Sequence, residues 1–435
     1  MSMTNLTQVF PNALRKHIFN AIQAKTPVFV WGDPGIGKSR IIQALVEALG
    51  YHFEDIRLSQ IESIDLRGLP TKDTDENGKP TVAWSKPDFL VRAEKAMKDL
   101  GKPTAFFFDE LNSGSPATMA AAYQFINDRR IGCFTLGERD VVLAAGNLET
   151  NGGITNMMPL PLANRFRHYQ MMMNSKQWLD FASTSGMHPW VTAYLSVQGN
   201  GSKLQQFDVE VLMGSSEKSY ATPRSWEMAS NAIWAAFGKQ NSTNPLKASY
   251  LDGEEESVFA EDVFGDDNDF AMTIKDLGVL VASCVGSPLA TDFAAFVNNG
   301  MDLPTAEDIL DGKALKPSEK NSKVKDNSSS QYFLAGSCCY GLLELRKKLI
   351  TMKESHGVKS DEYIKLDDTY NKKIENFFRF AEQYFTRELF IFAVINLMIK
   401  RFKVLPNPKK IDKDVFTHLT KEFNKARMQE DGATT

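Results

Sequence analysis

The sequence contains little cysteine and no large excess of charge of either sign. Only 4 of its 435 residues are cysteine, and their positions, 133, 284, 338 and 339, fit neither a metal-ligand motif nor a disulfide framework. This pattern favours a reducing compartment. The formal net charge is −4, which argues against a dedicated nucleic-acid binder because such proteins usually carry a strongly basic domain. A local basic patch is still compatible with this balance.

Long apolar runs are also absent. The first seven residues lack the apolar core of a signal peptide. The longest apolar stretch, residues 389–399, is too short to span a bilayer and contains Asn396, so we expect a buried helix there. The composition is otherwise ordinary for a globular protein, with 43% hydrophobic and 24% charged residues, and we find no internal repeat. We therefore expect a cytoplasmic protein of two or three domains with no membrane span.

A glycine-rich segment lies between an apolar run and an amphipathic stretch. Residues 32–39 read Gly-Asp-Pro-Gly-Ile-Gly-Lys-Ser and match the pattern G-x-x-x-x-G-K-[ST], with a predicted strand at 28–31 and a predicted helix at 38–49. Such a loop turns its backbone N–H groups toward one anion, and the helix N-terminus faces the same point. Lys38 would reach the outer phosphates of a nucleotide, and the Ser39 hydroxyl would bind Mg²⁺. The expected nucleotide-binding residues are Asp33, Pro34, Gly35, Ile36, Gly37, Lys38, Ser39 and Arg40.

A second apolar run, residues 104–108, ends in the carboxylates Asp109 and Glu110. A run without polar alternation is typical of a strand that is buried on both faces of a parallel sheet. The C-terminal ends of such strands are where open α/β sheets bind ligands. Asp109 would hold the Mg²⁺ ion, and Glu110 would orient and deprotonate the attacking water. With the phosphate loop, this pair predicts hydrolysis of a nucleoside triphosphate.

Further polar side chains are candidates for the same site. Asn147 follows the apolar run 141–145 and would hold the attacking water. Arg165 and Arg167 lie in a short segment after that run, where an arginine would reach the phosphate of a neighbouring subunit. Arg224 opens a predicted helix and would contact the terminal phosphate from a lid. Each of these residue types is common at strand ends or on surfaces. They indicate a nucleotide site only in combination with the phosphate loop.

Strands alternate with helices as far as residue 175, which predicts a doubly wound α/β core with a parallel sheet. Glycine and proline residues interrupt residues 61–88, for which we expect an irregular structure. Besides the runs already named, the pattern predicts strands at 51–58 and 167–172, helices at 11–24 and 116–129, and a small hairpin around Gly137 at 131–140. Ser115 is the expected N-cap of the second helix, with Pro116 at its first position.

Four parts make up the expected domain organisation. They are an α/β nucleotide-binding core at residues 1–175, an α-helical lid at 176–312, a flexible linker at 313–330 and a helical C-terminal extension at 331–435. The linker is predicted from a composition rich in lysine, serine and asparagine. A dense acidic run within residues 251–269 is predicted to be a solvated loop.

The motifs occur in a characteristic order. They are Gly-Asp-Pro-Gly-Ile-Gly-Lys-Ser at 32–39, Phe-Phe-Asp-Glu-Leu-Asn at 107–112, Ala-Ala-Gly-Asn at 144–147, Asn-Arg-Phe at 164–166 and Pro-Arg-Ser-Trp at 223–226. This set resembles the AAA+ ATPases. Within them it most resembles the MoxR-like group, supported by Asp-Leu-Arg-Gly-Leu-Pro at 65–70 and Trp-Ser-Lys-Pro-Asp-Phe-Leu at 84–90. The similarity spans about residues 10–310.

The resemblance implies an AAA+ P-loop core with a parallel sheet, a helical lid, and a ring, usually a hexamer, that binds ATP between subunits. It assigns Gly35, Gly37, Lys38 and Ser39 to phosphate and magnesium, Asp109 and Glu110 to the acid pair, Asn147 to the first sensor, Arg165 to the arginine finger and Arg224 to the second sensor. Many relatives have aspartate where this chain has Asn164, which leaves the finger open between Arg165 and Arg167. Residues 61–90 match an insert that points toward a pore or partner in related rings, so Trp84 and Phe89 are candidates to grip a client.

Three functions fit these observations. The first is an ATP-hydrolysing, chaperone-like remodeller of a protein client, with the partner bearing a von Willebrand factor A domain that MoxR-like proteins commonly have. The second is a nucleic-acid motor, supported by basic stretches at 346–348 and 400–403, although a solvated helix face explains these too. The third is a slow nucleotide-gated scaffold, against which Glu110 argues because a pure switch has less need of a catalytic base.

Overall fold

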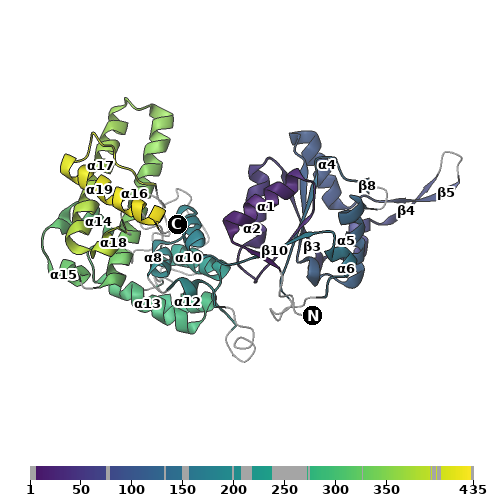
Figure 1. The fold of residues 1–435 in the computed structure, drawn as a ribbon, viewed down its shortest axis with the longest axis horizontal. Helices are drawn as coiled ribbons and strands as arrows, with labels where there is room; N and C mark the ends of the chain where they lie inside the picture. Colours follow the sequence, from purple (N-terminus) through teal and green to yellow (C-terminus); the bar gives the residue numbers. More distant parts are fainter. Residues whose placement is uncertain are drawn as a thin grey trace, which may run out of the picture. The chain divides into compact units, whose positions relative to one another are not determined.

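The computed structural model describes residues 6–74, 79–131, 134–148, 156–197, 200–206, 218–237, 275–325, 327–391 and 403–432, together with the single residues 272, 393 and 398. The chain folds into two units, the first of which runs as far as Gln177 and the second of which begins at Trp178 (Figure 1). The acidic run at 251–269 and Cys133 lie outside the described residues.

A six-stranded parallel sheet organises the first unit, in the order β1-β10-β2-β9-β6-β3. The strands are β1 (Thr7–Val9), β2 (Val28–Trp31), β3 (His52–Arg57), β6 (Thr104–Asp109), β9 (Val141–Gly146) and β10 (Arg167–Met171). The apolar runs that predicted buried strands are β2, β6 and β9, which occupy the middle of the sheet. Because helices cover both faces, these strands need no polar alternation.

Alternate side chains of β6 contribute to two hydrophobic cores, one on each face of the sheet. Phe107 belongs to the core under α1 (Pro11–Gln23) and α2 (Lys38–Ala48). Phe106 and Phe108 belong to the core under α4 (Asp88–Leu100) and α5 (Pro116–Asp128). Ser115 caps α5 by accepting a hydrogen bond from the Thr118 backbone amide, as predicted. The predicted parallel α/β core is thereby confirmed.

Residues 61–88 are more regular than predicted. They form α3 (Ser63–Arg67) and an antiparallel hairpin of β4 (Pro70–Thr74) and β5 (Pro80–Trp84), which projects from the sheet (Figure 1). Gly68 at its base has φ +84°, and a Cβ there would lie 1.8 Å from the Ser85 carbonyl oxygen. The prediction was wrong because the hairpin is exposed on both faces and therefore shows no hydrophobic alternation.

The short hairpin expected at 131–140 lies earlier than predicted. Its strands are β7 (Arg130–Ile131) and β8 (Phe134–Thr135), which pair antiparallel. Gly137 follows β8 and is held by Asp140, whose carboxylate accepts from the Gly137 amide at 2.7 Å and from the Thr104 amide at 2.8 Å.

The described part of the second unit is helical. Its α-helices are α7 (Ser175–Thr184, which begins in the first unit), α8 (Pro189–Ser196), α10 (Pro223–Phe237), α12 (Leu277–Val285), α13 (Ser287–Met301), α14 (Ala306–Leu310), α15 (Glu319–Lys325), α16 (Ser328–His356), α17 (Asp361–Tyr384), α18 (Arg387–Ile391) and α19 (Lys413–Gly432). Tyr194, Trp226 and Phe293 are buried together at the centre of α8, α10 and α13. This agrees with the predicted change to helix after the core.

The segment predicted as a flexible linker, residues 313–330, is structured. It contains a 3₁₀ turn at Lys313–Leu315, helix α15 and the start of α16. Val324 is fully buried, and the buried Asn321 amide donates to the carbonyl oxygens of Ala314 and Lys316. The linker prediction was wrong because a polar composition concealed these two inward-facing side chains.

Within the described residues, no helix combines the length and the apolar character needed to cross a bilayer. The apolar stretch at 389–399 begins in α18, where Leu389 and Phe390 are buried, as are Ala393 and Met398. Its other residues after Ile391 lie outside the described part of the chain.

A buried carboxylate fastens helix α4 to strand β3. Glu54 accepts from Arg92 Nε at 3.0 Å, lies 3.2 Å from His52 Nε2, and raises the pKa of Arg92. Arg92→Ala should lower the free energy of unfolding by about 1–3 kcal/mol, because it removes the cation from a buried anion. Urea denaturation of the full chain measures this. Lys95→Ala, which changes an exposed residue of the same helix, is the control. Equal urea midpoints for the two variants would show that the Arg92–Glu54 pair does not stabilise the fold.

Candidate nucleotide-binding site

The glycine-rich loop connects β2 to α2 and buries its lysine. Gly35 and Gly37 have positive φ angles of 75° and 93°, which glycine adopts without strain, and Gly37 precedes the first turn of α2. Lys38 Nζ donates to the carbonyl oxygens of Gly32 at 2.8 Å and Asp33 at 2.9 Å. Two carbonyl oxygens of the loop therefore hold the ammonium group of the first residue of α2.

The carboxylate that ends β6 is held directly against this loop. Ser39 Oγ donates to Asp109 Oδ2 at 2.7 Å, and the Glu110 amide donates to Asp109 Oδ1 at 3.0 Å. Hydroxyl and carboxylate oxygens are the ligands that Mg²⁺ prefers, and this ion is usually held by one or two carboxylates with substrate phosphates. Ser39 and Asp109 fit such an ion. Among the described residues there is no cluster of three or more His, Cys, Asp or Glu that could hold a metal by itself.

Asn147 joins the lysine to the end of β9. Its Oδ1 accepts from Lys38 Nζ at 2.9 Å, and its backbone carbonyl accepts from Asn112 Nδ2 at 2.8 Å. Asn112 is fully buried, and a Cβ at Gly146 would lie 2.2 Å from its Oδ1. A glycine is thus required before Asn147 so that Asn112 can reach it. The structure forms two hydrogen-bonded pairs, Lys38–Asn147 and Ser39–Asp109, which adjoin because Lys38 and Ser39 are consecutive residues.

Two residues of this site were missed by sequence reasoning. Ser59, just after β3, donates a hydrogen bond to Glu110 Oε2, and Arg57 pairs in register with Asp109. Glu110 itself has φ 51°, a left-handed conformation that is strained for a residue other than glycine. Asp55 raises the pKa of Arg57, with smaller contributions from Asp109 and Glu110. The predicted strand at 51–58 could have indicated both residues, because the C-terminal ends of parallel strands lie at the same edge of a sheet and Arg57 and Ser59 lie at or just after the end of this strand.

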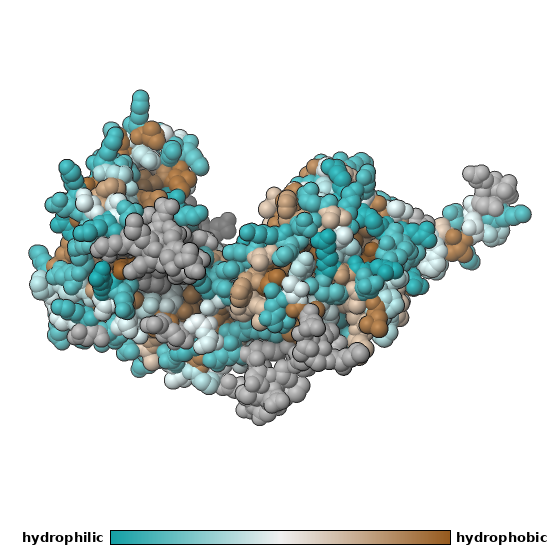
Figure 2. Space-filling view, in the orientation of Figure 1, coloured by the Kyte–Doolittle hydropathy of each residue, from teal (hydrophilic) through white to brown (hydrophobic). Residues whose placement is uncertain are grey.

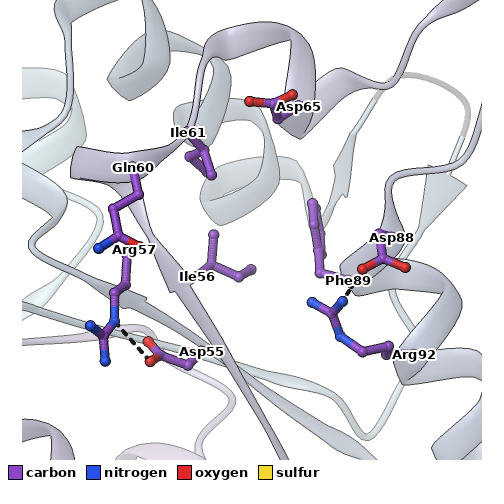
Figure 3. A pocket seen from close by; sticks show the side chains of 9 residues that line it. All are labelled: Asp55, Ile56, Arg57, Gln60, Ile61, Asp65, Asp88, Phe89 and Arg92. Atoms are coloured by element: carbon purple, nitrogen blue, oxygen red, sulfur yellow. Dashed lines mark hydrogen bonds and ion pairs between the residues drawn. The ribbon is translucent and has the colours of Figure 1, made fainter.

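A cavity of about 350 Å³ opens beside Arg57, lined by side chains of β3, α3, α4 and the segment that follows β3 (Figure 3). Its charged groups are already paired, since Arg57 Nε donates to Asp55 at 3.1 Å and Arg92 donates to Asp88. Burial raises the pKa of Asp55, and Arg57 opposes this effect. No residue of the phosphate loop lines this cavity, so it is separate from the loop.

Residues 27–175 match the family model described as an AAA domain of the dynein-related subfamily. This part of the chain is an AAA domain. The match confirms, at the level of this subfamily, the MoxR-like AAA+ resemblance that the motifs indicated. An AAA domain binds ATP and belongs to the ATPases, so both expectations are confirmed for residues 27–175.

Solved structures that resemble the chain share little sequence with it. A predicted ATPase from Cytophaga hutchinsonii is 14% identical over 53% of this chain and 65% of its own, with a TM-score of 0.30. NtrX from Brucella abortus is 15% identical over 49% and 52%, with a TM-score of 0.27. A point mutant of RuvB from Thermotoga maritima is 12% identical over 73% and 82%, with a TM-score of 0.28. The chain spans less than two thirds of the first two structures.

The two candidate arginine fingers of the AAA domain lie over opposite faces of its sheet. Arg165 follows α6 (Leu160–Ala163), donates from Nε to the Asn127 side chain on α5, and lies 5.8 Å from the ring centroid of Tyr123. Arg167 Nη1 donates at 2.8 Å to Asn20 Oδ1 on α1. The two arginines therefore contact helices that cover different faces of the sheet.

Arg224 belongs to the second unit, outside the AAA domain, and opens α10. It is exposed, whereas the residues around it, Ala221, Thr222, Pro223, Ser225 and Trp226, are buried. The Thr222 and Ser225 side chains accept from each other's backbone amides at 3.1 and 2.7 Å, which fixes the first turn of the helix. A rigid helix start therefore presents a single cation, and the contact of this cation with a nucleotide stays a prediction.

Proposed function

We propose that this chain is an ATP-hydrolysing ring protein that remodels a protein partner. The site formed by the adjoining hydrogen-bonded pairs Lys38–Asn147 and Ser39–Asp109 carries the proposal. It joins a phosphate-binding lysine, two oxygen ligands for a metal, and an amide at the C-terminal edge of one sheet, which is where hydrolysis of a triphosphate needs them.

Each side chain has a distinct task in this reaction. Loop amides and Lys38 hold the phosphates, and Ser39 and Asp109 hold the Mg²⁺ that offsets phosphate charge when it is bound. Glu110 takes a proton from the attacking water, while Asn147 keeps that water in line with the terminal phosphate. Arg224 reports loss of that phosphate from the lid.

A ring, most simply a hexamer, would complete the site with Arg165 of the next subunit. AAA proteins typically oligomerise. Two large apolar side chains near Arg165, Met157 and Leu160, are 80% and 83% exposed, which is typical of a surface that another protein covers. A neighbour seated there would receive the Arg165 guanidinium, which stabilises transition-state charge.

Mixing two inactive variants tests this arrangement. Arg165→Ala subunits should bind ATP but hydrolyse it roughly 100–1000-fold more slowly, because one transition-state contact is lost. Lys38→Ala subunits bind no ATP but still offer Arg165, so a mixture of the two should recover turnover. Arg167→Ala, on the opposite face, is the matched control and should stay active. A mixture with no recovered turnover, or an inactive Arg167→Ala, would move the finger away from Arg165.

The hairpin β4–β5 is the part of the AAA domain that we assign to a client. Val82 and Trp84 are 61% and 44% exposed on it, and Figure 2 shows apolar surface there. Phe89 was wrongly considered for the same task, because it is buried against Phe106 and Phe125 in the core. From the MoxR-like resemblance we also propose that the chain acts with a partner protein that bears a von Willebrand factor A domain.

Turnover assays separate a protein remodeller from a nucleic-acid motor. A remodeller's ATPase activity should rise with a co-purifying protein and ignore DNA, and Trp84→Ala should lose that rise while keeping basal turnover. Stimulation by DNA that falls steeply with salt would favour the motor instead.

In the basic stretch at 346–348, Lys347 pairs with Glu344 at 2.8 Å and Lys348 is exposed, which fits a solvated helix face. Of the stretch at 400–403, only Lys403 lies within the described residues.

A further inference from the structure

A hydrogen-bonded chain runs from the phosphate loop to the turn that carries Arg165. Trp31 is the last residue of β2 and directly precedes Gly32 of the loop. Its indole Nε1 donates to His168 Nδ1 at 2.9 Å, and His168 Nε2 lies 2.7 Å from the Ala163 carbonyl oxygen. Ala163 ends helix α6, two residues before Arg165. One imidazole therefore connects the two functional segments.

The chemistry of the partners fixes the state of this imidazole. An indole N–H can only donate, so His168 Nδ1 must accept and carries no proton. A carbonyl oxygen can only accept, so Nε2 carries the proton and donates to Ala163. Both ring nitrogens of His168 are thus engaged. A side chain that lacks the acceptor leaves the Trp31 indole N–H without its partner, and one that lacks the donor removes one hydrogen bond from the Ala163 carbonyl.

Packing and backbone hydrogen bonds hold both partners of His168, Trp31 and Ala163, in place. Trp31 is only 3% exposed, and its ring lies 4.3 Å from that of Phe29, so the indole has little room to turn away. The Ala163 carbonyl also accepts from the Phe166 amide at 3.1 Å, and the Arg165 amide donates to Leu162 at 3.1 Å. The imidazole consequently bonds to the same carbonyl that closes the Arg165 turn.

We propose that His168 is a positioning residue that sets the Arg165 turn and ties it to the phosphate loop of the same subunit. This rests on the proposed function, in which Arg165 completes the ATP site of a neighbouring subunit. A shift of Gly32 that moves Trp31 then moves the carbonyl of Ala163. The position in which one subunit presents Arg165 to the neighbouring ATP site thereby depends on the conformation of its own phosphate loop.

The test measures Arg165 only where it acts on a neighbour. Acceptor subunits carry Arg165→Ala, so they bind ATP and lack a finger. Donor subunits carry Lys38→Ala, so they bind no ATP and supply only Arg165. His168→Phe is added to the donors, where it keeps an aromatic ring and removes both hydrogen bonds. Tyr169→Phe, added to a second set of donors, is the matched control on the neighbouring position of β10.

Rings completed by His168→Phe donors should show a kcat about 3–10-fold below rings with Lys38→Ala donors, with KM unchanged, because ATP binding takes place in the acceptor. His168→Gln, which offers one acceptor and one donor, should restore much of the loss, and Tyr169→Phe should cause none. Equal kcat for His168→Phe and parent donors, in rings of equal size by light scattering, would overturn the proposal. If the parent donors give no turnover, the action of Arg165 on a neighbour fails instead, which is a separate outcome.

If His168→Phe donors do not enter rings, His168→Gln and Trp31→Phe donors decide the question. Trp31→Phe keeps an aromatic ring beside Phe29 and removes only the indole donor, so it should lower kcat in the acceptor as His168→Phe does. Full turnover with Trp31→Phe donors would show that the bond to Trp31 has no part in positioning Arg165.

Discussion

Lys38→Ala should abolish ATP binding by the AAA domain. The Lys38 ammonium is buried and donates to Gly32, Asp33 and Asn147, so it holds the loop in shape as well as meeting the phosphates. A hydrogen bond to a charged group contributes about 1.5–3 kcal/mol, and Lys38 offers several to the phosphates. We therefore expect an affinity at least roughly 100-fold weaker. Titration with a fluorescent ATP analogue measures it.

Two further variants separate the lost charge from a damaged loop. Lys38→Met keeps most of the aliphatic stem and removes the ammonium, so it should lose binding as fully as Lys38→Ala. Lys25→Ala removes an exposed lysine that pairs with the exposed Glu138 at 3.0 Å, and it should bind ATP normally. Near-normal affinity in either Lys38 variant would contradict the assignment of this loop to phosphate.

The central strands and the phosphate loop could be predicted because their signals are local. The runs that became β2, β6 and β9 are apolar throughout, and strands buried on both faces have no other composition. β1 gave no such signal, because it has three residues at the edge of the sheet and only Val9 is buried. The hairpin β4–β5 escaped prediction for a related reason, since neither of its faces packs on a core.

The missed parts of the site depend on which strands are neighbours. Ser59 meets Glu110 because β3 pairs with β6, and Trp31 meets His168 because β10 pairs with β2 across 137 positions of sequence. Strand order is not written in the local pattern, although the rule that ligands bind at the C-terminal edge narrows the choice. Composition alone also misjudged residues 313–330, where Asn321 and Val324 decide the packing.

Glu110→Gln should bind ATP and leave it uncleaved. Glutamine has nearly the shape of glutamate and can still accept a hydrogen bond from Ser59, so the turn with φ 51° at this residue need not change. An amide cannot take up the proton of the attacking water, and loss of a general base costs about 100–10,000-fold in rate. Turnover should fall by that factor, whereas affinity for ATP stays within about threefold of the parent chain.

The nucleotide that remains on the protein provides the measurement. After incubation with ATP and removal of free nucleotide, acid-quenched Glu110→Gln should release mainly ATP, whereas the parent chain releases ADP. Glu94→Gln, on the surface of α4 and paired with Lys86, is the control and should release ADP like the parent. Because Lys38→Ala blocks binding and Glu110→Gln blocks only cleavage, the two variants together separate phosphate binding from activation of the attacking water. Normal turnover by Glu110→Gln would refute the assignment of Glu110 as the base that takes the proton of the attacking water.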